Sequence, residues 1–247
     1  MRLLLLNPNT SRDITDLITE AARSVAPASV ELTSVTADRG VPYIATRAEA
    51  VIGAGVALEI LAEREGQYDA AIVAAFGDPG LGAARELFSV PIVGMAEAGM
   101  LTACMLGGRF AIVTFAEALG PWYRECVAMH RLDARCAGVL TLDNAFRSVG
   151  DVQNERADML VELARRAVEE HGADVVVLAG APLAGLARKV RDRIEVPIVD
   201  CVAAAVLQAV TLATLNPRAP AAGSFKRPMP KESIGLAKPL ADWIGHR

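Results

Sequence analysis

Short aliphatic runs alternate along the chain with longer segments in which apolar residues recur at helical spacing. The runs predict buried strands at residues 2–6, 30–36, 69–75, 91–94, 109–114, 137–142, 174–180 and 197–200. Helical segments follow them, and two of these begin with a hydroxyl cap and a carboxylate three residues later, at Thr10 and Thr46. Parallel strands need such helical crossovers, so the pattern predicts an α/β fold with parallel sheets covered on both faces.

The second half of the chain repeats the first. A strand, a glycine-containing turn, a helix and a second strand occupy Asp69–Val93 and return at Asp174–Val199, at an offset of 105 to 106 residues. We therefore expect two similar βαβ lobes related by a pseudo-twofold axis. Residues 1–95 with about 205–247 would form the first lobe and its tail, and residues 96–204 the second.

A ligand cleft is expected between these lobes. Open parallel sheets bind ligands beyond the carboxyl ends of their strands, and a pseudo-twofold axis makes equivalent strand ends face each other. Residues 75 and 180 end equivalent strands, so the repeat predicts them on opposite walls of the largest interlobe cleft. Such a cleft suits chemistry on both faces of one planar intermediate.

Composition narrows the classes of function. Apolar residues make up 53% of the 247 residues and charged ones 22%, with a formal net charge of −4. A chain this apolar is not disordered, and without a block of Lys or Arg it offers no patch for nucleic acid or an anionic membrane. The first aliphatic run stops at Asn7, too early for a signal peptide, and the other runs are far shorter than the roughly 20 residues of a membrane span. We expect a cytoplasmic protein with a small-molecule partner.

The cysteines and histidines lack the spacing of a metal site. Four cysteines match neither a metal knuckle nor a secreted disulfide framework, so free thiols are expected at Cys104, Cys126, Cys136 and Cys201. Three histidines fall at predicted helix ends or in the tail, where we interpret them as helix-terminus charges or solvated side chains: His130, His171 and His246. The sequence therefore predicts no metal, and it has no nucleotide-binding motif.

Six short segments, in order, carry a family resemblance that covers essentially the whole chain. They are Asn7–Thr10, Phe76–Leu81, Val93–Ala98, Arg109–Thr114, Ala184–Leu186 and Gly223–Phe225. Together they resemble the aspartate/glutamate/hydantoin racemase superfamily, most of all its hydantoin and allantoin racemase branch.

The resemblance implies proton transfer, without a cofactor, at a carbon next to a carbonyl. In this family two cysteines at opposed strand ends remove a proton from one face of the substrate and deliver one to the other. Backbone N–H groups and short polar side chains would hold the substrate oxygens and stabilise an enolate. The implied substrate is a small hydantoin, ureide or amino-acid-like carboxylate, and the implied assembly is a homo-oligomer.

Both cysteine positions are substituted in this chain. Ala75 occupies the first, directly before Phe76, and Gly180 occupies the second, directly before Ala181. Asp78 and Cys201 are the candidate catalytic substitutes. Each also has a structural interpretation, because an Asp before Pro-Gly is ordinary turn chemistry that caps a helix, and Cys201 is equally a small buried apolar residue.

Substrate-binding candidates follow from the strand ends and from the resemblance. They are Asn9, Thr10, Ala75, Phe76, Gly77, Thr114, Gly180 and Ala181. Asn9 and Thr10 have an alternative role as the turn and N-cap of the first helix. We also expect the Pro- and Gly-rich segment 216–231 to bring Ser224 and Phe225 towards the cleft.

Three functions remain open at this point. The first is a racemase or isomerase that transfers protons with groups other than cysteine. The second is a decarboxylase or another isomerase that uses the same oxyanion pocket with one proton donor or none. The third is a catalytically inactive protein that binds a small ligand. An acidic side chain beside the substrate carbon would favour the first two, and a cleft walled by backbone and methyl groups the third.

Overall fold

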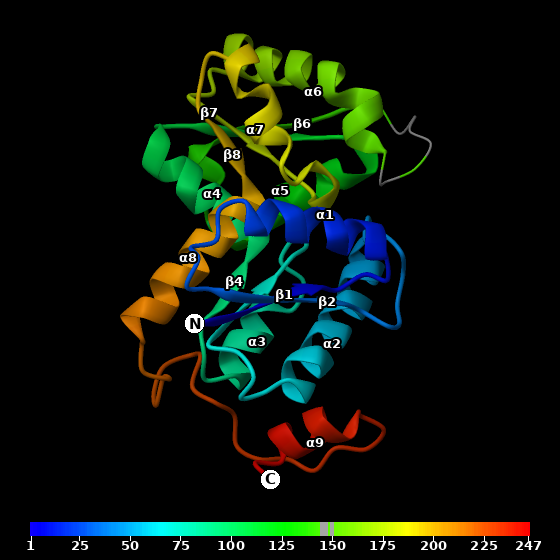
Figure 1. Cartoon of the computed structure of the whole chain (residues 1–247), viewed down its shortest axis with the longest axis vertical. Helices are drawn as coiled ribbons and strands as arrows, with labels where there is room; N and C mark the ends of the chain where they lie inside the picture. Colours follow the sequence, from blue (N-terminus) through cyan, green and yellow to red (C-terminus); the bar gives the residue numbers. More distant parts are fainter. Residues whose placement is uncertain (144–147, 149–150) are drawn as a thin grey trace.

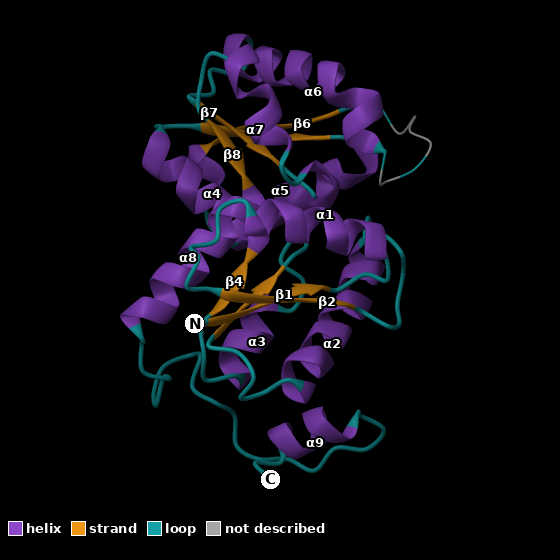
Figure 2. Ribbon diagram, viewed as in Figure 1, coloured by secondary structure: helices purple, strands orange, loops and turns teal. Residues whose placement is uncertain are grey.

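Two four-stranded parallel sheets form the framework of the molecule. The computed structural model describes residues 1–143, 148 and 151–247. The strand orders are β2-β1-β3-β4 and β6-β5-β7-β8, with every pairing parallel (Figure 2). The strands are β1 Arg2–Asn7, β2 Glu31–Thr36, β3 Ala70–Val73, β4 Ile92–Gly94, β5 Phe110–Thr114, β6 Cys136–Thr141, β7 Val175–Leu178 and β8 Ile198–Asp200. The predicted α/β fold with two similar parallel-sheet lobes is confirmed.

Helices connect the strands and cover the sheets. They are α1 Arg12–Arg23, α2 Arg47–Glu63, α3 Leu81–Leu87, α4 Met95–Leu106, α5 Gly120–Met129, α6 Val152–Glu169, α7 Leu186–Val190, α8 Cys201–Leu215 and α9 Lys238–Ile244. Short 3-10 turns lie at η1 Glu117–Leu119, η2 Asp133–Arg135, η3 Ala181–Leu183 and η4 Arg191–Arg193. Within the described residues, no helix combines the length and apolarity needed to cross a membrane.

The predicted helix starts are close to the observed ones. Thr46 caps α2 in a complete capping box with Glu49, as its sequence predicts. The first helix is capped by Ser11 and not by Thr10: the Ser11 hydroxyl accepts a hydrogen bond from Ile14 N at 3.3 Å. Thr10 N donates instead to Val41 O at 2.9 Å, so a contact with a distant loop shifts the helix start by one residue.

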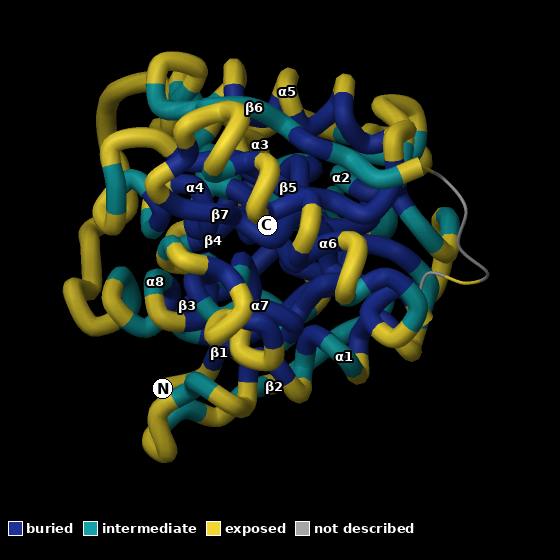
Figure 3. Tube along the Cα trace, turned by 90° about the horizontal axis from the view of Figure 1, so that it is seen from above, coloured by how far each residue is buried: buried dark blue, intermediate teal, exposed yellow. Residues whose placement is uncertain are grey.

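The central strands of both sheets are buried on both faces. Every residue of β3, β5 and β7 is buried, as expected for parallel strands covered by helices on each side. Seen from above, the buried strands occupy the middle of the molecule and exposed chain surrounds them (Figure 3). Aliphatic residues dominate this core, in keeping with the 4% aromatic content.

The two lobes exchange their last helices. Helix α4 follows β4 of the first sheet but packs on β7 and β8 of the second, whereas α8 follows β8 and packs on β3 and β4. The two helices also pack against each other between the lobes (Figure 1). At their crossing, a Cβ on Gly99 would lie only 2.7 Å from Cys201 Sγ. This exchange cross-braces the lobes. The predicted division at residues 95/96 and 204/205 stays a prediction, and its second boundary falls inside α8.

The C-terminal tail does not reach the interlobe region, so the expectation for Ser224 and Phe225 is wrong. Phe225 lines a surface cavity of about 120 Å³ beside the end of α3, on the first lobe. Trp243 anchors the tail there: its ring stacks on Phe88 with centroids 5.7 Å apart, and its Nε1 donates to Leu87 O at 2.9 Å. Burying this indole against α3 determines the path of the tail.

Candidate active site between the lobes

A small cavity lies between the ends of β3 and β7. Its volume is about 20 Å³, room for roughly one water molecule. The first lobe contributes Asn9, Ile14, Tyr43, Ile44, Ala75 and Phe76, and the second contributes Trp122, Tyr123, Gly180, Ala181 and Pro182. Residues 75 and 180 thus line one interlobe cavity, but the cavity is not the largest. Aromatic side chains fill the space, and larger cavities lie elsewhere on the described chain.

The phenol of Tyr123 lies where a side chain at position 180 would extend. Gly180 has a φ of +112°, and a Cβ built on it would lie 3.0 Å from Phe115 and 3.3 Å from Tyr123 Oη. Thr114 fixes this phenol, because its hydroxyl donates to Ala179 O at 2.9 Å and is also hydrogen-bonded to Tyr123. The missing side chain at Gly180 therefore leaves room for the phenol of Tyr123.

Tyr43 contributes a second phenol to the same cavity. Its Oη is buried and has no hydrogen-bond partner among the described residues. An unpaired buried hydroxyl costs free energy, so a ligand in this cavity gains by accepting a hydrogen bond from it. Burial raises the pKa of Tyr43 and of Tyr123 above that of an ordinary phenol, and both therefore carry their protons at neutral pH.

The predicted binding residues separate into two groups. Asn9, Ala75, Phe76, Gly180 and Ala181 line the cavity. The other three do not line it: Thr10, Gly77 and Thr114.

The residues outside the cavity have structural partners. Thr10 is held by Val41, Thr114 supports Tyr123, and a Cβ on Gly77 would collide with the ring of Trp122. Asn9 does both things that its position suggested, since its Oδ1 accepts from Ser11 N at 2.9 Å within the turn before α1 while the residue lines the cavity. The binding roles themselves stay predictions.

Asp78 is a buried helix cap. Its two carboxylate oxygens accept from Ala96 N and Glu97 N, each at 2.8 Å, at the start of α4. The residue has a φ of +48°, and a side chain on Gly94 would collide with its carboxyl group. Asp78 is therefore a helix cap, as its structural interpretation proposed, but it caps α4 and not α3, the helix directly after its turn. It does not line the cavity between residues 75 and 180.

Cys201 does not line that cavity either. Its thiol donates to Leu178 O at 3.3 Å and packs against Gly99 at the crossing of α4 and α8. Burial raises the pKa of the Cys201 thiol well above its usual range. A buried, protonated thiol is a poor base, and this position favours the interpretation of Cys201 as a small apolar residue.

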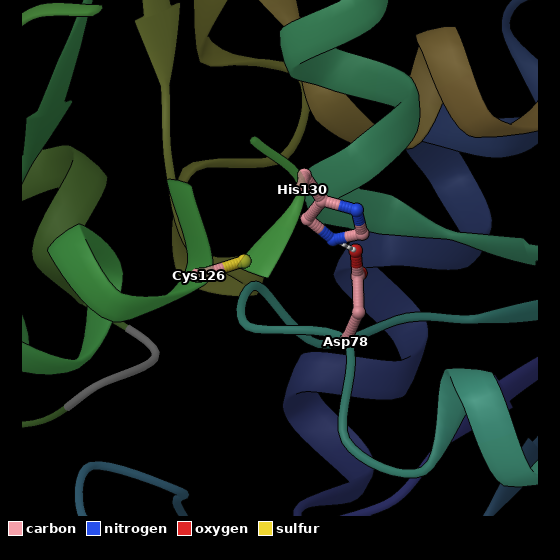
Figure 4. Close-up of side chains that lie close together, drawn as sticks. All are labelled: Asp78, Cys126 and His130. Carbon is pink, nitrogen blue, oxygen red and sulfur yellow. Dashed lines mark hydrogen bonds and ion pairs between the residues drawn. The ribbon is translucent and has the colours of Figure 1, made fainter. Parts of the chain in front are cut away.

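His130 lies at a helix end, as the sequence predicts, but its side chain is not solvated. It follows the last turn of α5, but its side chain is only 11% exposed. Its Nε2 lies 3.1 Å from Asp78 Oδ2 (Figure 4). Its Nδ1 lies 3.5 Å from Glu97 Oε1, and it is also hydrogen-bonded to Cys126. Asp78, which comes from the first lobe, explains why the prediction missed this burial, because the pattern along one helix does not show which residues of another lobe pack beside it.

The pKa values of His130, Cys126 and Glu97 are shifted far from their usual values. Burial on its own lowers the pKa of His130, but its hydrogen bonds with Asp78, Cys126 and Glu97 outweigh burial and raise the pKa to about 11. Burial raises the pKa of the Cys126 thiol to about 11 against the opposing effect of His130. For Glu97, burial opposes ionisation, yet its bonds to His130 and Arg85 lower its pKa to about 2.

The expectation of no metal-type cluster also needs correction. Asp78, Cys126 and His130 offer an oxygen, a sulfur and a nitrogen that all lie within 4.8 Å of one another. One feature of the sequence indicated this cluster: Cys126 and His130 are four residues apart and therefore share a helix face. The third member, Asp78, comes from the other lobe. The cluster borders a surface cavity of about 390 Å³ between α2 and α5, which Asp78 and Cys126 help to line.

Comparisons with known proteins agree with this architecture. The family model described as Asp/Glu/hydantoin racemase matches residues 3–209. The chain belongs to the Asp/Glu/hydantoin racemase family.

Three relatives show how far the similarity extends. The hydantoin racemase of Paenarthrobacter aurescens is 30% identical over 95% of this chain and 100% of its own. The crystal structure of allantoin racemase from Pseudomonas fluorescens is 31% identical with a TM-score of 0.89, covering 95% of this chain and 100% of that one. Allantoin racemase from Klebsiella pneumoniae is 33% identical with a TM-score of 0.91, covering 97% and 98%.

Proposed function

We propose that this protein is an enzyme that transfers a proton at the carbon next to a carbonyl in a small hydantoin, ureide or amino-acid-like carboxylate, without a cofactor and without cysteine. Family membership supports the racemase or isomerase class, and the hydantoin and allantoin racemase relatives support the substrate class. A cytoplasmic location and a homo-oligomeric assembly belong to the same proposal.

The observation that carries the proposal is the pair of phenols in the cavity between residues 75 and 180. Tyr43 and Tyr123 are the titratable side chains among the described residues that line it. Their raised pKa values make them proton donors and poor proton acceptors at neutral pH. The site is therefore suited to delivering a proton to an enolate carbon and ill-suited to removing one from a neutral carbon acid.

This asymmetry distinguishes the chain from a two-base racemase. Ala75 offers a methyl group on one wall and Gly180 no side chain on the other. The proposed step starts from an enolate, formed when the substrate loses a proton to water or loses carbon dioxide, with the electron pair left on carbon. The phenolic O–H bond of Tyr43 or Tyr123 then breaks as the new C–H bond forms, and water returns a proton to the phenolate. Backbone N–H groups at Gly180 and Ala181, together with the Asn9 amide, would hold the substrate oxygens.

Decarboxylation is the second candidate, and it is favoured because none of the described residues that line the cavity places a base beside the phenols. Loss of carbon dioxide from a malonate-type acid leaves the electron pair on carbon, so that only a proton donor is needed afterwards. Hydantoins and malonates both have a planar enolate-like intermediate, and both therefore belong in the same test.

The test begins with a thermal-shift screen of hydantoins, allantoin, amino acids and malonates, followed by turnover assays in deuterated water on each stabilising compound. We expect deuterium in the product at the carbon next to the carbonyl. Tyr123→Phe should keep the thermal shift, Tyr43→Phe should reduce it because the ligand loses a hydrogen bond, and the variant that lacks the donor should lose roughly 10²- to 10⁴-fold in rate. Binding without turnover would indicate a ligand-binding protein, and turnover that neither variant slows would rule out the phenols.

A further inference from the structure

We propose that Asp78, Cys126 and His130 bind one divalent transition-metal ion of the zinc type, at a site that joins the two lobes outside the reaction cavity. Among the described residues, this is the one group of three His, Cys, Asp or Glu side chains whose ligand atoms lie within 4.8 Å of one another. Zinc binds thiolate, imidazole and carboxylate ligands, and mixed sulfur, nitrogen and oxygen sets favour it over magnesium or calcium.

The distance between two of the three ligand atoms fits a tetrahedral ion. His130 Nε2 and Asp78 Oδ2 are 3.1 Å apart, and two ligands at roughly 2 Å from a tetrahedral zinc ion lie about 3.3 Å from each other. Cys126 and His130 occupy one face of α5, four residues apart, so a single helix presents two ligands together. With Asp78 ionised and Cys126 as a thiolate, a divalent cation leaves the ligand set neutral, which suits a buried site.

The groups behind the ligands are those that metal sites use to orient them. Glu97 Oε1 lies 3.5 Å from His130 Nδ1, the ring nitrogen that faces away from Asp78. Arg85 holds Glu97 through a hydrogen bond of 3.0 Å. Asp78 is in turn fixed by Ala96 N and Glu97 N. Carboxylate–histidine pairs and hydrogen-bonded carboxylate ligands of this kind set ligand orientation and tautomer.

The surroundings leave one side accessible. Asp78 and Cys126 line the surface cavity of about 390 Å³ between α2 and α5, and Trp122 forms part of the same wall. A water molecule or an exogenous ligand reaches the fourth coordination position from this side. Trp122 also lines the reaction cavity, so a metal that fixes α5 against the turn at Asp78 would fix one wall of that cavity.

Cobalt substitution tests the site without reference to activity. The full-length protein is freed of metal with a chelator and titrated with Co²⁺. We expect one Co²⁺ per chain, with thiolate-to-cobalt charge-transfer absorption and the intense visible bands of a four-coordinate ion, and Zn²⁺ should displace it. Weak octahedral bands, or no stoichiometric binding, would overturn the proposal.

Variants identify the ligands. Cys126→Ser should abolish the charge-transfer absorption, and His130→Gln should weaken Co²⁺ binding by at least about 100-fold, whereas Glu97→Gln should weaken it roughly 10- to 100-fold. Cys104→Ser and His171→Gln, which change a cysteine and a histidine outside the cluster, are matched controls and should bind as the unmodified protein does. Charge-transfer absorption that persists in Cys126→Ser would contradict the assignment.

The joining of the lobes has its own readout. A ligand that binds only the folded chain raises its melting temperature, so Zn²⁺ should raise the Tm of the unmodified protein and of Cys104→Ser by several degrees. Cys126→Ser, checked for folding by circular dichroism, should show no such rise. Stoichiometric binding with no change in Tm would contradict a role in holding the lobes together.

Discussion

The two lobes stabilise equivalent helix starts with carboxylates from different places. In the second lobe Asp200, at the end of β8, caps its own helix by accepting from Val202 N and Ala203 N, at 2.9 and 3.0 Å, and also accepts from Gly185 N. In the first lobe the equivalent position is Gly94, and the cap of α4 comes from Asp78 in the turn after β3.

As a result, the two carboxylates contact different lobes. Asp200 bonds only to backbone of its own lobe in these contacts, whereas Asp78 also contacts His130 of the other lobe. The two lobes share the αL glycines Gly80 and Gly185 at equivalent turns, whereas the polar groups that cap the helices differ. Asp78 joins the two lobes, and Asp200 is a local cap.

The largest predicted effect separates these two carboxylates. Asp78→Ala removes both hydrogen bonds that cap the start of α4. It also leaves His130 buried without its nearest anion, so we expect a loss of about 4 to 6 kcal/mol in the free energy of unfolding. Asp200→Ala removes a local cap and should cost about 1 to 2 kcal/mol. Urea unfolding followed by circular dichroism measures both, and equal losses would show that the lobes do not differ in this way. If Asp78→Ala does not fold, Asp78→Asn, which keeps one acceptor oxygen, takes its place.

The interlobe junction should also give the stability a particular pH dependence. The pKa of His130 is raised from 6.5 to about 11, so its stabilising contribution is complete below about pH 6.5 and is lost as the pH rises towards 11. In metal-free buffer, His130→Gln should cost roughly 3 kcal/mol near pH 6. The difference between the two proteins should narrow steadily up to about pH 10, and urea midpoints across this range check it. A difference that does not change with pH would contradict an ionised His130.

The two equivalent strand ends, at residues 75 and 180, should differ in their tolerance of a side chain. Gly180 has a φ of +112° and tight neighbours, so Gly180→Ala should lower the free energy of unfolding by about 1 to 3 kcal/mol. Ala75 already has a Cβ and faces the cavity, so Ala75→Cys should cost less than about 1 kcal/mol. Thermal or urea unfolding compares them directly. Equal tolerance at both positions would mean that Gly180 is not needed for its conformation.

The smallest effect concerns a second, exposed contact between the lobes. Arg47 on α2 donates to Glu125 on α5, with an Nε to Oε2 distance of 2.8 Å, and both side chains are more than half exposed. Exposed ion pairs contribute little because water and salt screen them. Glu125→Gln should leave the urea midpoint unchanged at physiological salt, in contrast to His130→Gln. A clear shift would show that the exposed pair also holds the lobes.

Sequence pattern was sufficient for the fold because the relevant signals are local. Buried parallel strands need continuous aliphatic runs, and the repeat at Asp69 and Asp174 places equivalent strand ends together without any knowledge of packing. The start of α1 was off by one residue because Thr10 is held by Val41, a contact that spans 31 positions along the chain. The tail was misplaced because the indole of Trp243, and not the Gly-Ser-Phe segment, determines where it packs.

The sequence predicted residues that line the cavity, but not the side chains that could transfer a proton there. Ala75 and Gly180 could be located from the repeat, but Tyr43 lies in a loop after β2 and Tyr123 within α5, far in sequence from either strand end. The cluster at His130 depends on Asp78, in a turn of the opposite lobe. The helical pattern around His130 therefore indicated only that this residue lies at a helix end. Side chains that come together across a pseudo-twofold axis have no characteristic separation in the sequence, so no spacing pattern identifies them.

The most direct test of the central claim, proton delivery by phenols without a base, is polarimetry of single enantiomers of a hydantoin and of allantoin, with deuterium incorporation measured alongside. The unmodified protein should show no two-base racemisation at rates typical of the family, because losing one positioned base commonly costs ~10²- to 10⁴-fold and neither Ala75 nor Gly180 offers one. The Ala75→Cys, Gly180→Cys double variant should gain activity, limited by the strain at Gly180. Rapid racemisation by the unmodified protein would contradict the account and identify an unrecognised base in the cavity.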